Sequence, residues 1–180
     1  VWGFGPDKPV DPPTESQLAT AFKRVGSHRL ELSSNVGDWK LRKKQPDVYV
    51  DLSAIAKGYG VDRMAEALRE LGFENFLVEV GGEVVAGGKG PGNRPWRVGL
   101  ETPDGGVQDI ESTVSLGAAL ATSGNYRNFK MVDGKRIGHT LDPRTGKPVE
   151  HQTASVSVVA PSCMDADGWA TALLVLGAEE

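Results

Sequence analysis

The chain has 180 residues, which is enough for one domain with a sizeable core or for two small domains packed together. Its 39% hydrophobic and 24% charged residues are typical of a globular protein, and no apolar stretch is long enough to span a membrane. A net charge of −4 with no basic run argues against nucleic-acid binding, and the single cysteine, Cys163, excludes an internal disulfide.

The first third of the chain predicts one short helix and three strands. A proline-rich segment at 6–13 is expected to be extended or turning, and residues 14–17 then form a capping box that opens a helix ending near Val25. Alternating or β-prone residues predict strands at 29–33, 39–42 and 48–52, with a turn at 45–47 between the last two.

The longest predicted helix runs from about 54 to 71, where apolar residues repeat with helical spacing. We expect Ser53 to cap this helix and Gly72 to close it. Two glycines, Gly58 and Gly60, weaken its first turns, so we expect a close approach to the backbone at these positions.

Strand patterns dominate the rest of the chain. Strands are predicted at 76–80, 83–86, 96–100, 109–116, 118–123 and 153–159, with a hairpin at 129–137 that turns at Asp133 and Gly134. A last helix is predicted at 165–176. Runs of strands punctuated by two strong helices predict an α+β fold rather than regular βαβ winding.

The glycine-rich loop at 87–92 invites comparison with phosphate-binding loops. Lys89 is followed by Gly90 rather than by Ser or Thr, which excludes a Walker A loop. The third glycine of the dinucleotide fingerprint is also missing. We therefore expect a mobile surface loop here.

Asp167 and Thr171 form the most informative pair in the sequence. They lie four residues apart in the last predicted helix, so they share one face of it. Both side chains are oxygen donors of the kind that Mg²⁺ prefers, and we expect the pair to face solvent and substrate. A helix-dipole carboxylate and a packed threonine would show the same spacing, so the pair alone leaves both interpretations open.

Other polar residues lie where predicted elements meet. Asp51 and Lys57 flank a strand end followed by a helix start, where free N–H groups can bind an anion, although the residues alone favour a helix-start residue and a solvated charge. Residues 121–127 place polar side chains after a strand of small residues, which also fits an ordinary turn. His139 begins a turn-rich loop and could act as a general base or have a structural role.

Taken together, these segments resemble the ApbE family of FAD:protein FMN transferases. The resemblance rests on residues 2–6, 51–59, 80–83, 121–127 and 139–148 together with Asp167 and Thr171, and so spans nearly the whole chain. It implies a T-fold-like α+β arrangement of mainly antiparallel sheets with a few helices, as a single domain over 1–180. A further N-terminal region and a C-terminal tail of the family are expected to be missing from this sequence.

The resemblance also implies a chemistry, the Mg²⁺-dependent transfer of FMN from FAD to a Thr or Ser hydroxyl of a target flavoprotein, with release of AMP. The residues that match the family's site are the Mg²⁺ ligands Ala54 (through its main-chain carbonyl), Asp167 and Thr171, the FAD contacts Asp51, Lys57 and Leu141, and His139, which stands where the family has a histidine proposed to assist the transfer.

The acceptor implied by the resemblance is a respiratory or electron-transfer flavoprotein. The expected location is the bacterial cell envelope, on the periplasmic side of the inner membrane, with membrane attachment only through a lipid anchor that precedes this sequence. Two other functions fit the same residues, a Mg²⁺-dependent FAD pyrophosphatase that yields FMN and AMP, and a non-catalytic FAD-binding module.

Overall fold

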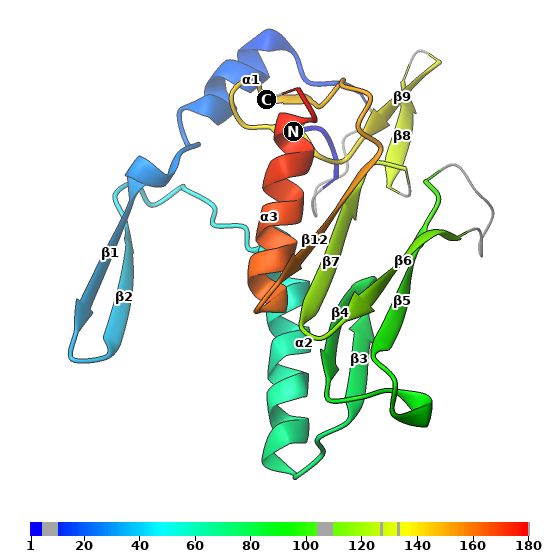
Figure 1. Cartoon of the computed structure of the whole chain (residues 1–180). Coiled ribbons are helices and arrows are strands. Elements are labelled where there is room, and N and C mark those ends of the chain that lie inside the picture. Colours follow the sequence, from blue (N-terminus) through cyan, green and yellow to red (C-terminus); the bar gives the residue numbers. More distant parts are fainter. Residues whose placement is uncertain (5–10, 104–109, 127, 133, 180) are drawn as a thin grey trace.

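The fold is built around a four-stranded antiparallel sheet in the order β12-β7-β4-β3. The computed structural model describes residues 1–4, 11–103, 110–126, 128–132 and 134–179 (Figure 1). The strands of the central sheet are β3 (Phe76–Val80), β4 (Glu83–Gly87), β7 (Ala119–Gly124) and β12 (Ser155–Ala160).

Two long helices, α2 (Ser53–Glu70) and α3 (Cys163–Leu176), pack together and cover one face of this sheet (Figure 1). The core between the helices and the sheet consists of Val61, Ala65, Phe76, Val78, Val85, Ala119 and Cys163, all buried. Burial of this apolar surface is the main force that holds the helix pair on the sheet.

The opposite face of the sheet is covered by the antiparallel pair β5 (Trp96–Glu101) and β6 (Ile110–Leu116). Side chains of β4 alternate, so Val85 points to the helices while Val84 and Ala86 point to the second core, which includes Leu116 and Leu120. The molecule is therefore layered, with β4 and β7 buried between helices on one side and strands on the other.

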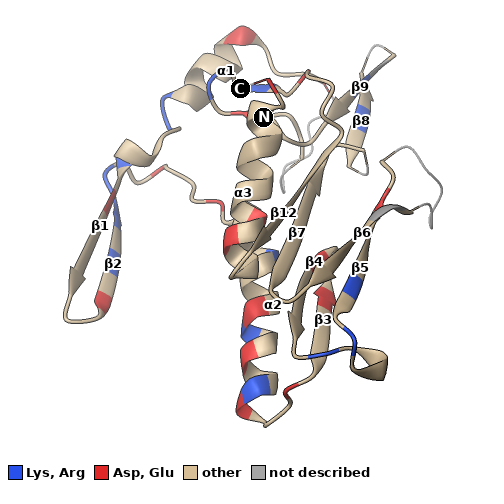
Figure 2. Cartoon of the chain, in the orientation of Figure 1, with Lys and Arg blue, Asp and Glu red and all other residues tan. Residues whose placement is uncertain are grey.

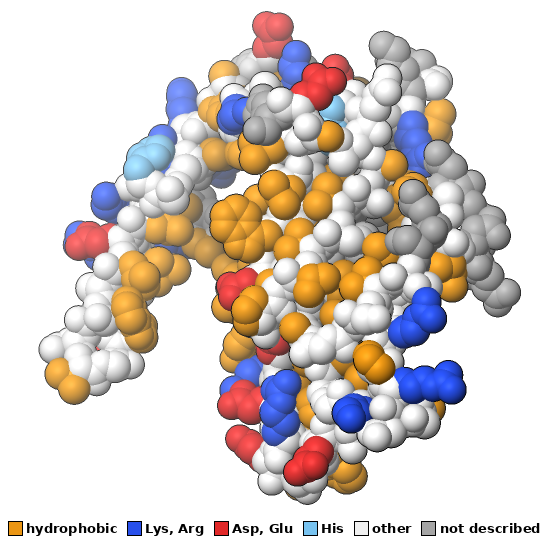
Figure 3. Space-filling view, viewed as in Figure 1, with side chains coloured by type: hydrophobic (Ala, Val, Ile, Leu, Met, Phe, Trp, Pro, Cys, Tyr) orange, Lys and Arg blue, Asp and Glu red, His pale blue; other side chains and the backbone are white. Residues whose placement is uncertain are grey.

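Smaller elements surround these layers. They are α1 (Glu15–Phe22), η1 (Ser27–Arg29), β1 (Leu30–Asn35), β2 (Asp38–Lys43), η2 (Pro91–Asn93), β8 (Phe129–Val132), β9 (Lys135–Gly138), β10 (Leu141–Asp142) and β11 (Lys147–Pro148). The β1–β2 hairpin extends away from the body and exposes Leu32, Trp39 and Leu41 (Figures 1 and 3). Acidic and basic residues alternate along α2 (Figure 2), and Arg63 pairs with Glu66.

The predicted α+β class is confirmed, and most predicted elements appear within a few residues of their expected bounds. The capping box before α1 is present, with Thr14 accepting from the Gln17 N–H and the Gln17 side chain accepting from the Thr14 N–H. The turn expected at 45–47 is also present, with the Val48 N–H donating to the Gln45 carbonyl.

Two expectations about local structure are wrong. Residues 48–52 form no strand, because this segment pairs with no neighbouring strand and leads directly into α2. Ser53 does not cap α2, because it is the first helical residue and Leu52 occupies the cap position. The Ser53 hydroxyl instead donates a hydrogen bond to the Asp51 carboxylate. The glycine-rich loop lies at the surface and contains a short 3₁₀ turn and a Gly90–Arg94 bridge, while its mobility stays a prediction.

Some expectations fall outside the described residues. These are most of the proline-rich segment, the first residue of the 109–116 strand, Arg127 and the hairpin residue Asp133. Within the described part of the chain, no helix is both long enough and apolar enough to cross a bilayer.

Candidate functional site

The two long helices touch at Gly58. This residue is buried, and a Cβ atom added to it would lie 2.3 Å from the carbonyl oxygen of Cys163 and 2.8 Å from the Cα atom of Met164. Only a glycine lets α3 approach the α2 backbone this closely. A Cβ at Gly60 would meet nothing within 4 Å, so the predicted close approach is confirmed at Gly58 and wrong at Gly60.

Because the two helices lie so close at Gly58, the Asp167 side chain reaches the backbone of α2. Its Oδ2 atom accepts a hydrogen bond from the Gly58 N–H at 3.0 Å, and its side chain is only 2% exposed. In an α-helix the Gly58 N–H faces the carbonyl of Ala54, four residues earlier. The Asp167 carboxylate therefore lies beside the first turn of α2, where the predicted carbonyl ligand is located. The expectation that Asp167 faces solvent is wrong, because α3 buries this face against α2.

A second carboxylate, Asp62 of α2, fixes the start of α3. Its two oxygens accept from the Cys163 N–H at 2.8 Å and from the Met164 N–H at 2.9 Å. The hydroxyl of Ser162 accepts from the Asp165 N–H at 3.1 Å, which satisfies another donor of the same first turn. Sequence reasoning missed Asp62, because a helix cap supplied from another helix leaves no local pattern.

Thr171 connects the site to the central sheet. Its Oγ1 atom lies 3.0 Å from the Oγ atom of Ser123, near the end of β7. Ser123 belongs to the polar segment 121–127, so this segment and the Asp167–Thr171 face of α3 meet in the structure. Both hydroxyls are only partly buried.

Lys57 pairs with a buried carboxylate. Its Nζ atom lies 2.6 Å from Oε1 of Glu83, the first residue of β4, which is completely buried. Burial raises the pKa of Glu83, the Lys57 ammonium opposes this rise, and the nearby charge of Asp167 adds to it. Glu83 belongs to the 80–83 segment, but the sequence alone assigned it no role. Glu83, Lys57 and Asp167 thus form one charged cluster.

Asp51 lies just before α2 and is exposed. Its Oδ1 atom accepts from the Ser53 N–H at 2.8 Å and from the Ser53 hydroxyl. These bonds hold the pKa of Asp51 below its ordinary value, so its carboxylate stays charged.

His139 lies beside the N-terminal segment of the chain. Its Nδ1 atom is 3.1 Å from the carbonyl oxygen of Asn128, and its ring meets the Phe4 ring edge-on at 6.3 Å. A carbonyl oxygen only accepts, so in the neutral imidazole Nδ1 carries the proton and Nε2 has the lone pair. The Trp2 indole donates to the Gly146 carbonyl at 2.7 Å, which joins the first residues to the His139 loop.

Leu141 is half-buried in β10, which contacts α3. The predicted site residues therefore form two groups, one at the crossing of α2 and α3 and one on the His139 loop, both adjoining α3. Within the described residues, no recorded hydrogen bond joins the two groups.

The residues that could hold a metal are Ala54, Asp167 and Thr171, which offer a carbonyl, a carboxylate and a hydroxyl oxygen. Hard oxygen donors suit Mg²⁺, which keeps coordination positions for water or substrate phosphates. Among the described residues, no group of three or more His, Cys, Asp or Glu side chains could hold a metal.

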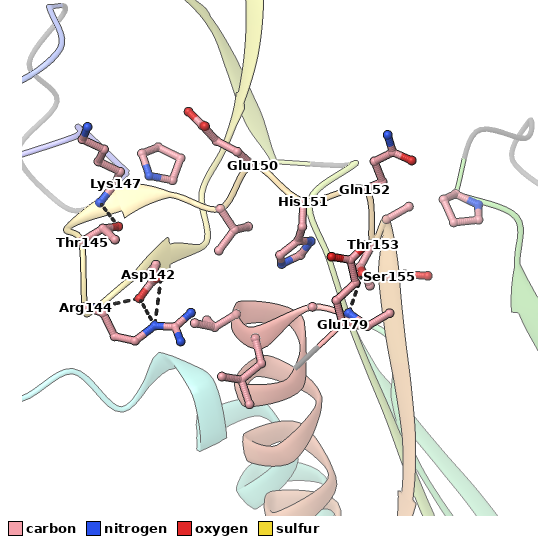
Figure 4. A pocket seen from close by; sticks show the side chains of 18 of the residues that line it. Asp142, Arg144, Thr145, Lys147, Glu150, His151, Gln152, Thr153, Ser155 and Glu179 are labelled. Atoms are coloured by element: carbon pink, nitrogen blue, oxygen red, sulfur yellow. Dashed lines mark hydrogen bonds and ion pairs between the residues drawn. The ribbon is translucent and has the colours of Figure 1, made fainter.

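A large open cavity of about 1240 Å³ lies at the other end of α3 (Figure 4). His151 lines it, and its Nε2 atom donates to the Leu174 carbonyl at 2.6 Å. Asp142 and Arg144 form an ion pair on the same wall. None of the seven predicted site residues lines this cavity, so the cavity is separate from the candidate site.

Comparison with known proteins extends over the whole chain. A family model described as the ApbE family matches residues 1–180. The FAD:protein FMN transferase of Klebsiella pneumoniae is 42% identical over 182 residues, covering 100% of this chain and 52% of that protein. The enzyme of the same name from Haemophilus influenzae is 44% identical over 183 residues, covering 100% of this chain and 53% of that protein. The chain thus spans about half the length of the curated relatives it matches.

The solved structures that resemble this chain are also ApbE proteins. The flavin transferase ApbE from Vibrio cholerae superposes with a TM-score of 0.85 at 42% identity, covering 99% of this chain and 56% of that one. The ApbE protein from Thermotoga maritima gives a TM-score of 0.86 at 32% identity, covering 97% and 56% of the two chains. These neighbours confirm that the α+β arrangement is that of the ApbE structures. Since both the family model and these relatives cover almost every residue, this chain belongs to the ApbE family.

Proposed function

We propose that the chain catalyses transfer of FMN from FAD to a Thr or Ser hydroxyl of a target flavoprotein, with release of AMP. The observation that carries this proposal is the hydrogen bond between Asp167 and Gly58, which brings the carboxylate on α3 to the first turn of α2. The names of the relatives, FAD:protein FMN transferase, support the same reaction.

The proposed cation is Mg²⁺, with the Ala54 carbonyl, Asp167 and the Thr171 hydroxyl as its ligands. This donor set fits a hard cation, because it offers only oxygen atoms and one full negative charge. When bound, Mg²⁺ neutralises charge on the pyrophosphate of the substrate and favours attack at phosphorus. The burial of Asp167 strengthens its interaction with a cation, because less water screens the charge.

FAD is the proposed substrate, contacted by Asp51, Lys57 and Leu141. The Lys57 ammonium supplies positive charge near the proposed pyrophosphate position. The start of α2 adds backbone N–H groups that favour an anion. Leu141, half-buried on β10, offers an apolar contact.

The transfer step also requires a proton acceptor. The acceptor hydroxyl oxygen forms a bond to the phosphorus of the FMN half, the P–O bond to the AMP phosphate breaks, and the hydroxyl proton leaves. His139 or a nearby carboxylate takes that proton. The Nε2 atom of His139 suits this role, because Nδ1 donates to the Asn128 carbonyl and leaves the Nε2 lone pair as the acceptor.

We further propose that the target is a respiratory or electron-transfer flavoprotein and that the reaction takes place in the bacterial cell envelope. The resemblance of the motifs to the family supports both points.

The test is to incubate the full chain with FAD, Mg²⁺ and an acceptor flavoprotein domain, then to analyse the products by mass spectrometry. A covalent FMN adduct on a Thr or Ser of the acceptor, with an equal amount of AMP, is the expected result. AMP and free FMN without an adduct would assign the chain as a pyrophosphatase. Retention of FAD with no AMP would assign it as a flavin-binding module.

A further inference from the structure

Glu83 is a completely buried carboxylate that the proposed reaction does not yet use. It follows a turn at Gly81 and Gly82, whose φ angles of 63° and 98° lie in the left-handed region that favours glycine. A buried carboxylate is strongly disfavoured unless a positive partner and hydrogen bonds compensate its lost hydration. The position of Glu83 is therefore fixed by β4, and its charge requires a partner.

That partner is Lys57, at 2.6 Å. The two ends of the pair differ, because the Glu83 side chain is 0% exposed while that of Lys57 is 49% exposed. The charge of Asp167 acts on Glu83, so the Lys57–Glu83 pair lies near this proposed cation ligand. The second Glu83 oxygen, Oε2, has no hydrogen-bond partner in the part of the chain that the structure describes.

We propose that Glu83 is a positioning residue, which holds the Lys57 ammonium so that its other N–H donors meet a phosphate oxygen of FAD. This inference rests on the proposed function, in which Lys57 contacts FAD, and it assigns Glu83 as the residue that orients Lys57. A lysine has a flexible four-carbon stem and three donors, and the bond to Glu83 uses one of them. A rigid, buried acceptor limits the positions that the ammonium can occupy before the substrate arrives.

A positioning role differs from a purely structural one in how two substitutions combine. If Glu83 acts through Lys57, its replacement changes substrate affinity only while Lys57 is present. If Glu83 only supports the fold, its effect persists after Lys57 is replaced. A double-mutant cycle separates these two cases.

The experiment measures KM for FAD and kcat in the full chain for Glu83→Gln, Lys57→Met and the double variant. We expect each variant to raise KM about tenfold, corresponding to about 1.4 kcal/mol, with a smaller change in kcat. The double variant should match Lys57→Met. Glu66→Gln, which removes a pair with Arg63 on the exposed face of the same helix, is the matched control and should leave KM unchanged. Additive effects, or an unchanged KM in Glu83→Gln, would overturn the inference.

A second measurement does not depend on turnover. The acetylation rate of Lys57 without FAD, followed by peptide mass spectrometry, should rise severalfold in Glu83→Gln because the amine loses its partner. Should Glu83→Gln fail to fold, Glu83→Asp, which keeps the charge but draws it back from Lys57, replaces it in both measurements. An acetylation rate equal to that of the wild type would contradict the positioning role. A wild-type chain that protects Lys57 yet transfers no FMN would instead refute the proposed function alone.

Discussion

The backbone N–H of Gly58 on α2 and the carboxylate of Asp167 on α3 are joined by a hydrogen bond of 3.0 Å between residues 109 positions apart in the chain. This bond links the packing of the two helices to the proposed cation site, because the carboxylate oxygen that it fixes belongs to a proposed ligand. The position of Asp167 thus depends on how closely the two helix backbones approach each other.

Replacement of Gly58 by alanine should test that dependence. The new Cβ would lie 2.3 Å from the Cys163 carbonyl, so α3 must move away from α2. We expect Gly58→Ala to lower the free energy of unfolding by roughly 1–3 kcal/mol, as overpacking does in other cores. The measurement is urea denaturation followed by circular dichroism.

Gly60→Ala is the matched control on the same helix. A Cβ at Gly60 meets nothing within 4 Å, so alanine should stabilise the helix by about 0.5–1 kcal/mol through its better helix propensity. Equal unfolding midpoints for the two variants would show that the helices do not meet at Gly58.

Two substitutions of Asp167 should separate its charge from its hydrogen bond. Asp167→Asn keeps an oxygen that can accept from the Gly58 N–H but removes the negative charge, so we expect Mg²⁺-dependent AMP release to be lost while the fold is kept. Asp167→Ala removes both the charge and the hydrogen bond, and the loss of a hydrogen bond to a charged group should cost about 1.5–3 kcal/mol of unfolding free energy. Urea denaturation and a Mg²⁺ titration of AMP release measure the two effects.

AMP release at the wild-type rate by Asp167→Asn would exclude Asp167 as a metal ligand. Equal stability of the Asn and Ala variants would show that the bond to Gly58 contributes nothing measurable.

Replacement of His139 should slow transfer but not binding. In His139→Gln the proposed proton acceptor is gone, and general-base catalysis typically contributes about 10²–10⁴-fold to a rate. We expect a fall of that order in the rate of adduct formation, with FAD affinity preserved. Single-turnover kinetics measures the rate, and quenching of flavin fluorescence measures the affinity. A large loss of affinity with an unchanged rate would reassign His139 to substrate binding.

The thiol of Cys163 should be inert in the folded chain. Burial raises the pKa of this thiol from 9.0 to about 12, with smaller contributions from the charges of Asp62, Glu83 and Asp167. Because the pKa is higher in the folded state, the stabilisation that this thiol contributes is complete below pH 9.0 and is lost as pH rises from there to about 12. A colorimetric disulfide reagent should react with the thiol only after urea is added. Rapid labelling in native buffer would contradict the burial.

Local patterns predicted most elements because helix and strand formation here follows from nearby residues. The capping box before α1 and the helical spacing in α2 involve residues a few positions apart, so they are visible in the sequence. The predicted strand at 48–52 does not form, because a strand also depends on residues far away in the chain. Its residues favour β structure, but no neighbouring strand pairs with them, and a strand requires a partner.

The sequence suggests the residues of the candidate site, which stay predictions, but not the contacts that these residues make. Asp167 and Thr171 share one face of a predicted helix, yet the burial of Asp167 depends on a glycine in a different helix. The pairing of Lys57 with Glu83 joins a helix to a strand 26 positions later, and no periodic pattern encodes it. Long-range contacts of this kind arise from tertiary packing, which a single sequence does not show.

The carboxylate of Asp62 has a consequence for the motions of the molecule. It holds the amides of Cys163 and Met164 from across the helix pair, while Asp167 holds the amide of Gly58 in the reverse direction. We expect these amides to exchange with solvent deuterium mainly when the two helices separate, so hydrogen exchange should give all three a similar opening free energy. We therefore expect Asp167 to move together with the start of α3 rather than by itself.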